Sequence, residues 1–92
     1  MEFSEIRKRI EMKYGEIDRN SGSLFLLAVF FEEAGELAEA VRKNDIYQIE
    51  DELTDCLFMI MSLANYYGID IELKLIEKYL KGDPSSEWDL PS

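Results

Sequence analysis

The chain has 92 residues with a net charge of −10, from 20 acidic and 10 basic side chains, and contains one cysteine and no histidine. This length suits one small domain, often stabilised by oligomerisation, and a lone cysteine excludes an intrachain disulfide. The negative charge disfavours nucleic acid and anionic membranes as partners. The N-terminus lacks a signal-peptide core and the longest apolar run is too short to span a bilayer, so we expect a soluble, cytoplasmic protein.

Helix signals dominate the chain, and no segment shows the sustained two-residue alternation of a strand, so the predicted fold class is all-α. The first helix is expected over about residues 3–15, with its end near Gly15. The following stretch EIDRNSGS, residues 16–23, is rich in turn-forming residues, and Ser21 or Ser23 is the expected cap of the next helix.

The second helix is expected from about residue 23 to residue 43. Arg42 and Lys43 suit its C-terminal end, where cations interact favourably with the helix dipole. Asn44 and Asp45 leave room only for a tight connection. A connection this short makes the second and third helices antiparallel neighbours.

The third helix is expected to run to about Tyr67, and Asp70 is placed to cap a shorter fourth helix that ends near Leu80. Both prolines lie in the last eleven residues, which are therefore not expected to be helical. The predicted organisation is one helical domain over residues 1–81 and a non-helical tail over 82–92.

Two acids of the second helix lie on or beside its apolar side. At about 100° per residue, Glu33 shares a side with the apolar residues of the helix, and Glu36 lies next to it. The apolar residues on that side are Leu26, Val29, Leu37 and Ala40.

The third helix repeats this arrangement. Glu52 and Asp55 are predicted to border its apolar stripe, and they have the same three-residue spacing as Glu33 and Glu36, which places each pair on one helix face. The stripe comprises Ile46, Ile49, Leu53, Cys56, Leu57, Ile60, Leu63 and Ala64.

Four acids near a helix interface destabilise the fold unless protons or a cation neutralise them. No lysine or arginine occurs in residues 44–73, and the absence of histidine argues against zinc sites and against di-iron sites built on Glu-x-x-His. No EF-hand loop is present. An all-oxygen set suits Mg²⁺, with Mn²⁺ as the alternative. Ordinary solvated acids on amphipathic helices are the competing interpretation.

The acids belong to a longer pattern. Glu32-Glu33-x-x-Glu36, followed after fifteen residues by Glu52-x-x-Asp55, resembles the EExxE…ExxD signature of MazG-like nucleoside triphosphate pyrophosphohydrolases. The surrounding segments EEAGELAEAVRKND and EDELTDCLFMIMSLANYYGIDIE are also similar to that family, and the resemblance extends over roughly residues 5–80.

The resemblance implies a four-helix, MazG-like bundle completed by oligomerisation, as a homodimer or a dimer of dimers. It also implies hydrolysis of an NTP or dNTP to the monophosphate and pyrophosphate, with a possible role in cleaning the nucleotide pool. The positions that match the family's Mg²⁺ ligands are Glu33, Glu36, Glu52 and Asp55. Any of these acids, or Glu32, could orient or deprotonate the attacking water.

The resemblance leaves the substrate open. Lys78 lies where relatives carry a basic residue that can meet phosphate, although an exposed helical lysine needs no such role. Related sequences often have a tryptophan near Val29, which is missing here. Contact with a base could instead involve Phe30, Tyr66 or Trp88, each of which is also explained by packing.

A second interpretation from another class is a noncatalytic helical module that binds a partner protein, with the acids as a structural or vestigial metal site. The segment from Leu57 to Met61 is apolar nearly all round, so more than one surface must cover it. We expect an oligomer interface to be one of these surfaces.

Overall fold

The computed structural model describes residues 1–82 of the chain, and its regular structure there is entirely helical, which confirms the all-α prediction. The last residues, including Trp88, lie outside the described part, so the division into 1–81 and 82–92 stays a prediction. The elements are α1 (Phe3–Ser21), α2 (Ser23–Lys43), α3 (Ile46–Tyr66), α4 (Ile71–Leu75) and the π-helix η1 (Ile76–Lys81).

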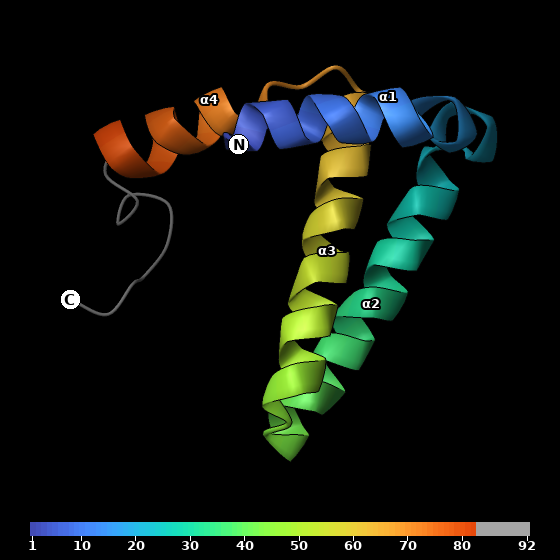
Figure 1. The fold of residues 1–92 in the computed structure, drawn as a ribbon, viewed down its shortest axis with the longest axis vertical. Coiled ribbons are helices and arrows are strands. Elements are labelled where there is room, and N and C mark those ends of the chain that lie inside the picture. The colour runs from blue at the N-terminus through green and yellow to red at the C-terminus, as the bar shows by residue number, and fades with distance from the viewer. Residues whose placement is uncertain (83–92) are drawn as a thin grey trace.

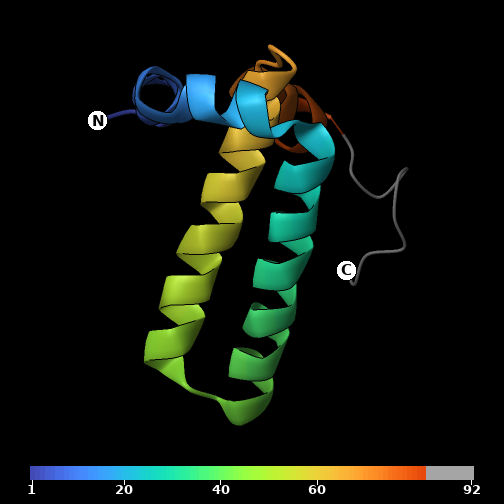
Figure 2. The ribbon, with the colours of Figure 1, turned by 90° about the vertical axis from the view of Figure 1, so that its right-hand side faces the viewer.

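The body of the molecule is the antiparallel hairpin of α2 and α3. Figure 1 shows α1 lying across one end of this hairpin, while α4 and η1 extend from the same end. Figure 2 shows α2 and α3 side by side along their length, with the tight connection at the opposite end. The hairpin therefore has one end joined to the other helices and one free end.

The first helix is longer than predicted. It continues through Gly15 to Ser21, so the expected end near Gly15 is wrong. Gly15 is buried, and the side chains of Glu11 and Arg19 form an ion pair that spans it. A helical glycine lowers stability by only about 1 kcal/mol relative to alanine. The neighbouring contacts outweigh this local preference.

The real break comes at Gly22, whose φ of 89° lies in a region that residues with a side chain rarely adopt. Gly22 also occupies the N-cap position of α2, where no side-chain hydrogen bond is made. The predicted cap is therefore wrong. Ser21 still belongs to α1, and its hydroxyl donates to the carbonyl of Ile17 at 2.9 Å. Ser23 is already the first residue of α2.

The connection between α2 and α3 agrees with the prediction. Asn44 adopts the left-handed conformation with φ 55°, and the N–H of Asp45 donates to the carbonyl of Ala40 at 3.1 Å. Asp45 then caps α3, since its carboxylate accepts the N–H of Gln48 at 3.2 Å. Two residues thus end one helix and begin the next.

The third helix ends with a similar device. Gly68 has φ 64°, and the N–H of Ile69 donates to the carbonyl of Ala64 at 2.8 Å, which is the hydrogen bond of a Schellman motif. Asp70 caps α4 as predicted, accepting the N–H of Leu73 at 3.0 Å. The chain stays helical from α4 into η1, which includes Leu80.

The core between the helices is small. Its buried apolar side chains come mainly from α3, which contacts both α2 and α1. Tyr14 of α1 packs edge-on against Phe58 of α3, with ring centroids 5.1 Å apart. The buried apolar residues are Leu26, Ala40, Cys56, Met59, Met61 and Ala64.

A polar network holds α1, α3 and α4 together at the joined end. Arg7 Nε donates to both carboxylate oxygens of Glu72 at 2.9 Å, and another guanidinium nitrogen donates to Asn65 Oδ1 at 2.6 Å. Asn65 Nδ2 in turn donates to the backbone carbonyl of Arg7 at 3.1 Å. These partly buried charges are thereby paired.

The face of α3 that meets α2 differs from the predicted stripe. Glu52 was expected at the border of that stripe, yet it is only 6% exposed and lies inside the hairpin. Leu53 and Leu57, assigned to the stripe, are exposed instead. The helix is turned so that Glu52, Cys56 and Met59 face inward. A second apolar stripe is left uncovered.

Among the described helices, none combines the length and apolar character that crossing a bilayer requires.

Candidate metal centre

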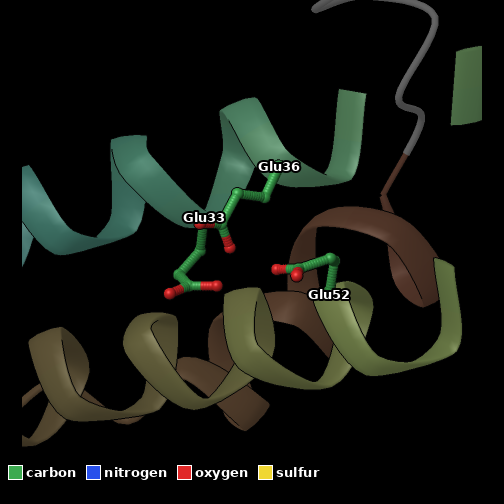
Figure 3. A group of neighbouring side chains, drawn as sticks. All are labelled: Glu33, Glu36 and Glu52. Carbon is green, nitrogen blue, oxygen red and sulfur yellow. The ribbon is translucent and has the colours of Figure 1, made fainter. Parts of the chain in front are cut away.

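Three carboxylates meet between α2 and α3. Glu33 and Glu36 lie one turn apart on α2, and the tight connection brings Glu52 of α3 opposite them. One carboxylate oxygen from each lies within 4.8 Å of the others. Figure 3 shows the three side chains pointing into the space between the helices. The i, i+3 spacing and the antiparallel hairpin therefore create this cluster, called here the inner triad.

The inner triad runs from the interior to the surface. Glu52 is buried, Glu33 is half-buried and Glu36 is exposed. With both groups ionised, Oε2 of Glu33 and Oε2 of Glu52 are buried without any hydrogen-bond donor. A buried carboxylate oxygen without a donor is costly. The site consequently calls for a proton or a cation.

The pKa values of Glu33 and Glu52 also indicate that the site requires a proton or a cation. The pKa of Glu33 is raised to about 7, chiefly because its carboxyl can donate a hydrogen bond to Glu52, and further by burial and the charge of Glu36. The Glu33 hydrogen bond acts to lower the pKa of Glu52. Burial and the charge of Glu36 outweigh it, so the pKa of Glu52 is also raised. Without metal, the pair therefore tends to share a proton.

A second acidic group adjoins the first. Asp51, Glu52 and Asp55 also offer carboxylate oxygens within 4.8 Å of one another. Asp55 is half-buried and Asp51 is exposed. The four predicted ligands thus divide between two overlapping triads that share Glu52. Asp51 was not identified from the sequence, although it lies four residues before Asp55 on the same helix face.

Two other predicted site residues lie outside both triads. Glu32 is exposed on α2, consistent with its expected position on a solvated flank. Lys78 lies on η1, half-buried, with its Nζ 5.7 Å from the ring centroid of Tyr79. The candidate base-contacting rings pack on neighbours: Phe30 lies 5.9 Å from Phe31, and Tyr66 lies 5.1 Å from Tyr67, measured between centroids.

Cys56 is the chain's one thiol and lies near the acids. It is buried one turn after Glu52, and burial, followed by the charges of Glu33 and Glu52, raises the pKa of its thiol. The protonated thiol is a poor ligand. The triads therefore offer oxygen donors only, and their residues fit a hard divalent cation of the Mg²⁺ or Mn²⁺ type.

Comparison with known families agrees with this chemistry. The family model of the MazG nucleotide pyrophosphohydrolase domain matches residues 22–85. A search of curated proteins found no match. The matched range begins after α1 and contains the whole hairpin with both acidic triads. Since it covers well over half of the sequence, the chain belongs to the MazG nucleotide pyrophosphohydrolase family.

Proposed function

We propose that this protein is a Mg²⁺-dependent nucleoside triphosphate pyrophosphohydrolase that converts an NTP or dNTP and water to the monophosphate and pyrophosphate. The observation that supports this most directly is the pairing of the half-buried Glu33 with the buried Glu52, whose Oε2 atoms are buried and face no donor. In a purely structural cluster, only a shared proton would offset this electrostatic cost. Members of this family are generally metal-dependent, and binding of a metal ion would explain why these acids are held together.

The proposed cation ligands are Glu33, Glu36, Glu52 and Asp55. A bound Mg²⁺, or Mn²⁺ in its place, would neutralise these acids, polarise a phosphoryl oxygen and offset the charge of the departing pyrophosphate. The acids themselves would orient the triphosphate, which arrives as a metal complex. The exposed Glu36 marks the side from which this complex can enter.

The water is positioned by a carboxylate. Glu33 is one of the acids proposed to orient this water or accept its proton. Glu32 is one residue away and exposed, so it is available to accept a proton outside the cluster. Lys78 is proposed to meet a phosphate oxygen. These proposed assignments concern the reaction class and leave the base and the sugar open.

We also propose a cellular location and an oligomeric state. We place the protein in the cytoplasm as a homodimer or a dimer of dimers, without nucleic acid or membrane as partners. Its net charge of −10 would repel both of those polyanionic surfaces. Removal of unwanted nucleotides from the cellular pool would be a suitable role for such an activity.

The test is a panel of canonical and modified dNTPs and NTPs, incubated with Mg²⁺ and assayed separately for pyrophosphate and orthophosphate. Pyrophosphate released in equal amount to the monophosphate is the expected result. Orthophosphate alone would indicate another kind of hydrolase. A folded, metal-binding preparation that cleaves nothing across the panel would overturn the proposal in favour of a noncatalytic interaction module.

A further inference from the structure

The N-terminal half of α1 is the most basic stretch of an otherwise acidic chain. Its bases lie within residues 7–13, where Glu11 is the one acid, whereas acidic side chains far outnumber basic ones over residues 22–82. Charges attract or repel one another over about 10 Å at ordinary salt concentration. A negatively charged segment is therefore drawn to this half of α1 and repelled elsewhere. The bases are Arg7, Lys8, Arg9 and Lys13.

A hollow of about 530 Å³ lies beside this basic stretch and is called here the basic hollow. Most of the polar groups around it already have partners. Arg7 donates hydrogen bonds to both Glu72 and Asn65. The carboxylate of Glu11 pairs with Arg19. The lining residues are Arg7, Lys8, Glu11, Met12 and Asn65.

Lys8 and Met12 are the lining residues that are open to a further partner. Met12 leaves 86% of its surface accessible, and Lys8 is exposed and forms no ion pair with any residue from 1 to 82. The two lie one turn apart on the same face of α1. An ammonium group next to an exposed thioether suits a ligand that carries a carboxylate beside an aromatic ring, because the cation pairs with the acid and sulfur packs favourably on rings.

The chain's own C-terminal segment, residues 83–92, has this chemistry. Its sequence is DPSSEWDLPS, with acids at positions 83, 87 and 89 and no base. Trp88 stands between Glu87 and Asp89 and is the chain's one tryptophan. The segment therefore carries both of the groups that suit the basic hollow.

The basic hollow is within reach of this segment. Arg7 Nε donates to the carboxylate of Glu72 at 2.9 Å, so α4 begins next to the basic stretch of α1. The helical stretch from Glu72 to Gly82 is at most about 15 Å long. An extended chain from Gly82 to Trp88 spans up to about 20 Å. That length is enough to return alongside η1 and α4.

The chain turns at Gly82, directly after η1. Its backbone there is extended, with φ −92° and ψ 179°, and a Cβ atom would lie 2.9 Å from the carbonyl oxygens of Glu77 and Lys78. Only glycine allows the backbone to pass so close to the end of the helix. The chain therefore leaves the helix axis at Gly82, as a segment that returns toward α1 must.

We propose that the C-terminal segment folds back along α4 into the basic hollow, with Trp88 against Met12 and the flanking acids facing Lys8. The contact is made within one chain, and this inference does not rest on the proposed hydrolysis. It adds a second link between α4 and α1 to the ion pair of Arg7 with Glu72.

A second hollow near α4 suits this segment less well. It has a volume of about 220 Å³ and is lined by residues without charge from α3, α4 and their connection. The carboxylates on either side of Trp88 would meet no cation in that lining, whereas the basic hollow provides one. Salt dependence therefore distinguishes the two hollows. The lining residues are Ile60, Leu63, Ala64, Tyr67, Ile69 and Ile71.

The fluorescence of Trp88 tests the contact, because no other residue of the chain contributes tryptophan emission. At about 0.01 M salt, the emission should be blue-shifted from that of the urea-unfolded chain. Acrylamide quenching should increase at least about twofold when the salt is raised to about 1 M, where ion pairs are screened. Emission at the unfolded wavelength in low salt would overturn the proposal. A blue shift that salt leaves unchanged would point to the uncharged hollow instead and would also overturn it.

Charge reversal tests the proposed partners. Lys8→Glu should expose Trp88 in low salt, with the same increase in quenching. Arg42→Glu is the matched control, since it makes the same change at an exposed residue near the free end of the hairpin and should keep the wild-type emission. Adding Glu87→Lys and Asp89→Lys to Lys8→Glu should restore the protection, because the charges are exchanged. Wild-type quenching in Lys8→Glu, or no recovery in the triple variant, would refute the pairing. Far-UV circular dichroism verifies that each variant is folded.

Dilution distinguishes the chain's own segment from that of a second copy. A contact within one chain should give the same emission between about 10 μM and about 100 nM, because its effective concentration is fixed by the chain itself. A shift to the unfolded wavelength on dilution would show that the segment binds another molecule. That result would overturn the assignment to a single chain.

Discussion

Two clusters of charged side chains in this small chain are partly buried, and they have opposite electrostatic character. At the joined end of the hairpin, Arg7 donates hydrogen bonds to both oxygens of Glu72 and to Asn65, so these charges are compensated. In the middle of the hairpin, Glu33 and Glu52 face each other with buried oxygens that have no donor. A satisfied network fixes helices in place, whereas an unsatisfied one requires a proton or a bound cation.

The largest expected effect is on catalysis. Glu33→Gln and Glu52→Gln preserve shape but remove a negative charge, and each should lower turnover at least about 100-fold, as loss of groups that support a metal site does. Pyrophosphate release at saturating Mg²⁺ is the measurement. Glu39→Gln is the matched control, because Glu39 lies on α2 in an exposed pair with Lys43. Normal turnover in both cluster variants would refute the ligand assignment.

Mg²⁺ should raise the free energy of unfolding through the acidic cluster and not through the network around Arg7. At about 100 times the dissociation constant, Mg²⁺ that binds only the folded chain raises the free energy of unfolding by about 2.7 kcal/mol. Urea unfolding with Mg²⁺, compared with unfolding in EDTA, measures this gain. Glu52→Gln should abolish it and Arg7→Met should keep it. A gain of equal size in Glu52→Gln would place the cation elsewhere.

The satisfied cluster should respond in the opposite way. Arg7→Met leaves the carboxylate of Glu72 without its partner, and both side chains are only 15% exposed. We expect the free energy of unfolding to fall by about 2 kcal/mol, with no direct change in metal affinity. Arg9→Met removes an exposed i, i+4 pair with Glu5 and should cost less than about 0.5 kcal/mol. Equal losses in the two variants would show that the network is no stronger than a surface pair.

How far the sequence predicts these features depends on whether a local rule determines them. The hairpin follows from Asn44 and Asp45, and the spacing of Glu33 and Glu36 places both on one side of a helix whatever it packs against. The end of α1 follows no such rule, because the helix continues through Gly15, where the side chains of Glu11 and Arg19 form an ion pair. Capping by Ser21 fails because its hydroxyl already bonds within α1.

The orientation of α3 also lay beyond sequence reasoning. This helix has two apolar stripes, and periodicity cannot tell which one meets α2. The pattern favours the broader stripe containing Leu53, whereas the structure turns Glu52 inward and leaves Leu53 exposed. Asp51 was missed for another reason, since its spacing to Asp55 on one helix face is visible in the sequence and the structure groups it with Glu52 and Asp55. Ile46, Leu53 and Leu57 of the predicted stripe are left exposed.

The smallest expected effect is a pH dependence that only the unsatisfied cluster produces. A carboxyl whose pKa rises on folding, as that of Glu33 does to about 7, adds stability that is complete below its unfolded pKa of 4.5. This stability is lost as the pH rises through about 7. In EDTA, the melting temperature should therefore fall by a few degrees between pH 5 and pH 8. Thermal melts of wild type and Glu33→Gln isolate the contribution, since the variant should show a shallower fall.

Saturating Mg²⁺ should abolish this fall, because the cation competes with the proton for the same carboxylates. Below about pH 7, the apparent affinity for Mg²⁺ should rise up to about tenfold per pH unit if one proton is displaced. Calorimetric titration at several pH values in buffers of different ionisation enthalpy counts the protons released. Arg7→Met should release the same number, because its cluster shares no carboxylate with the triads. A pH-independent affinity would mean that Glu33 is already ionised in the free protein.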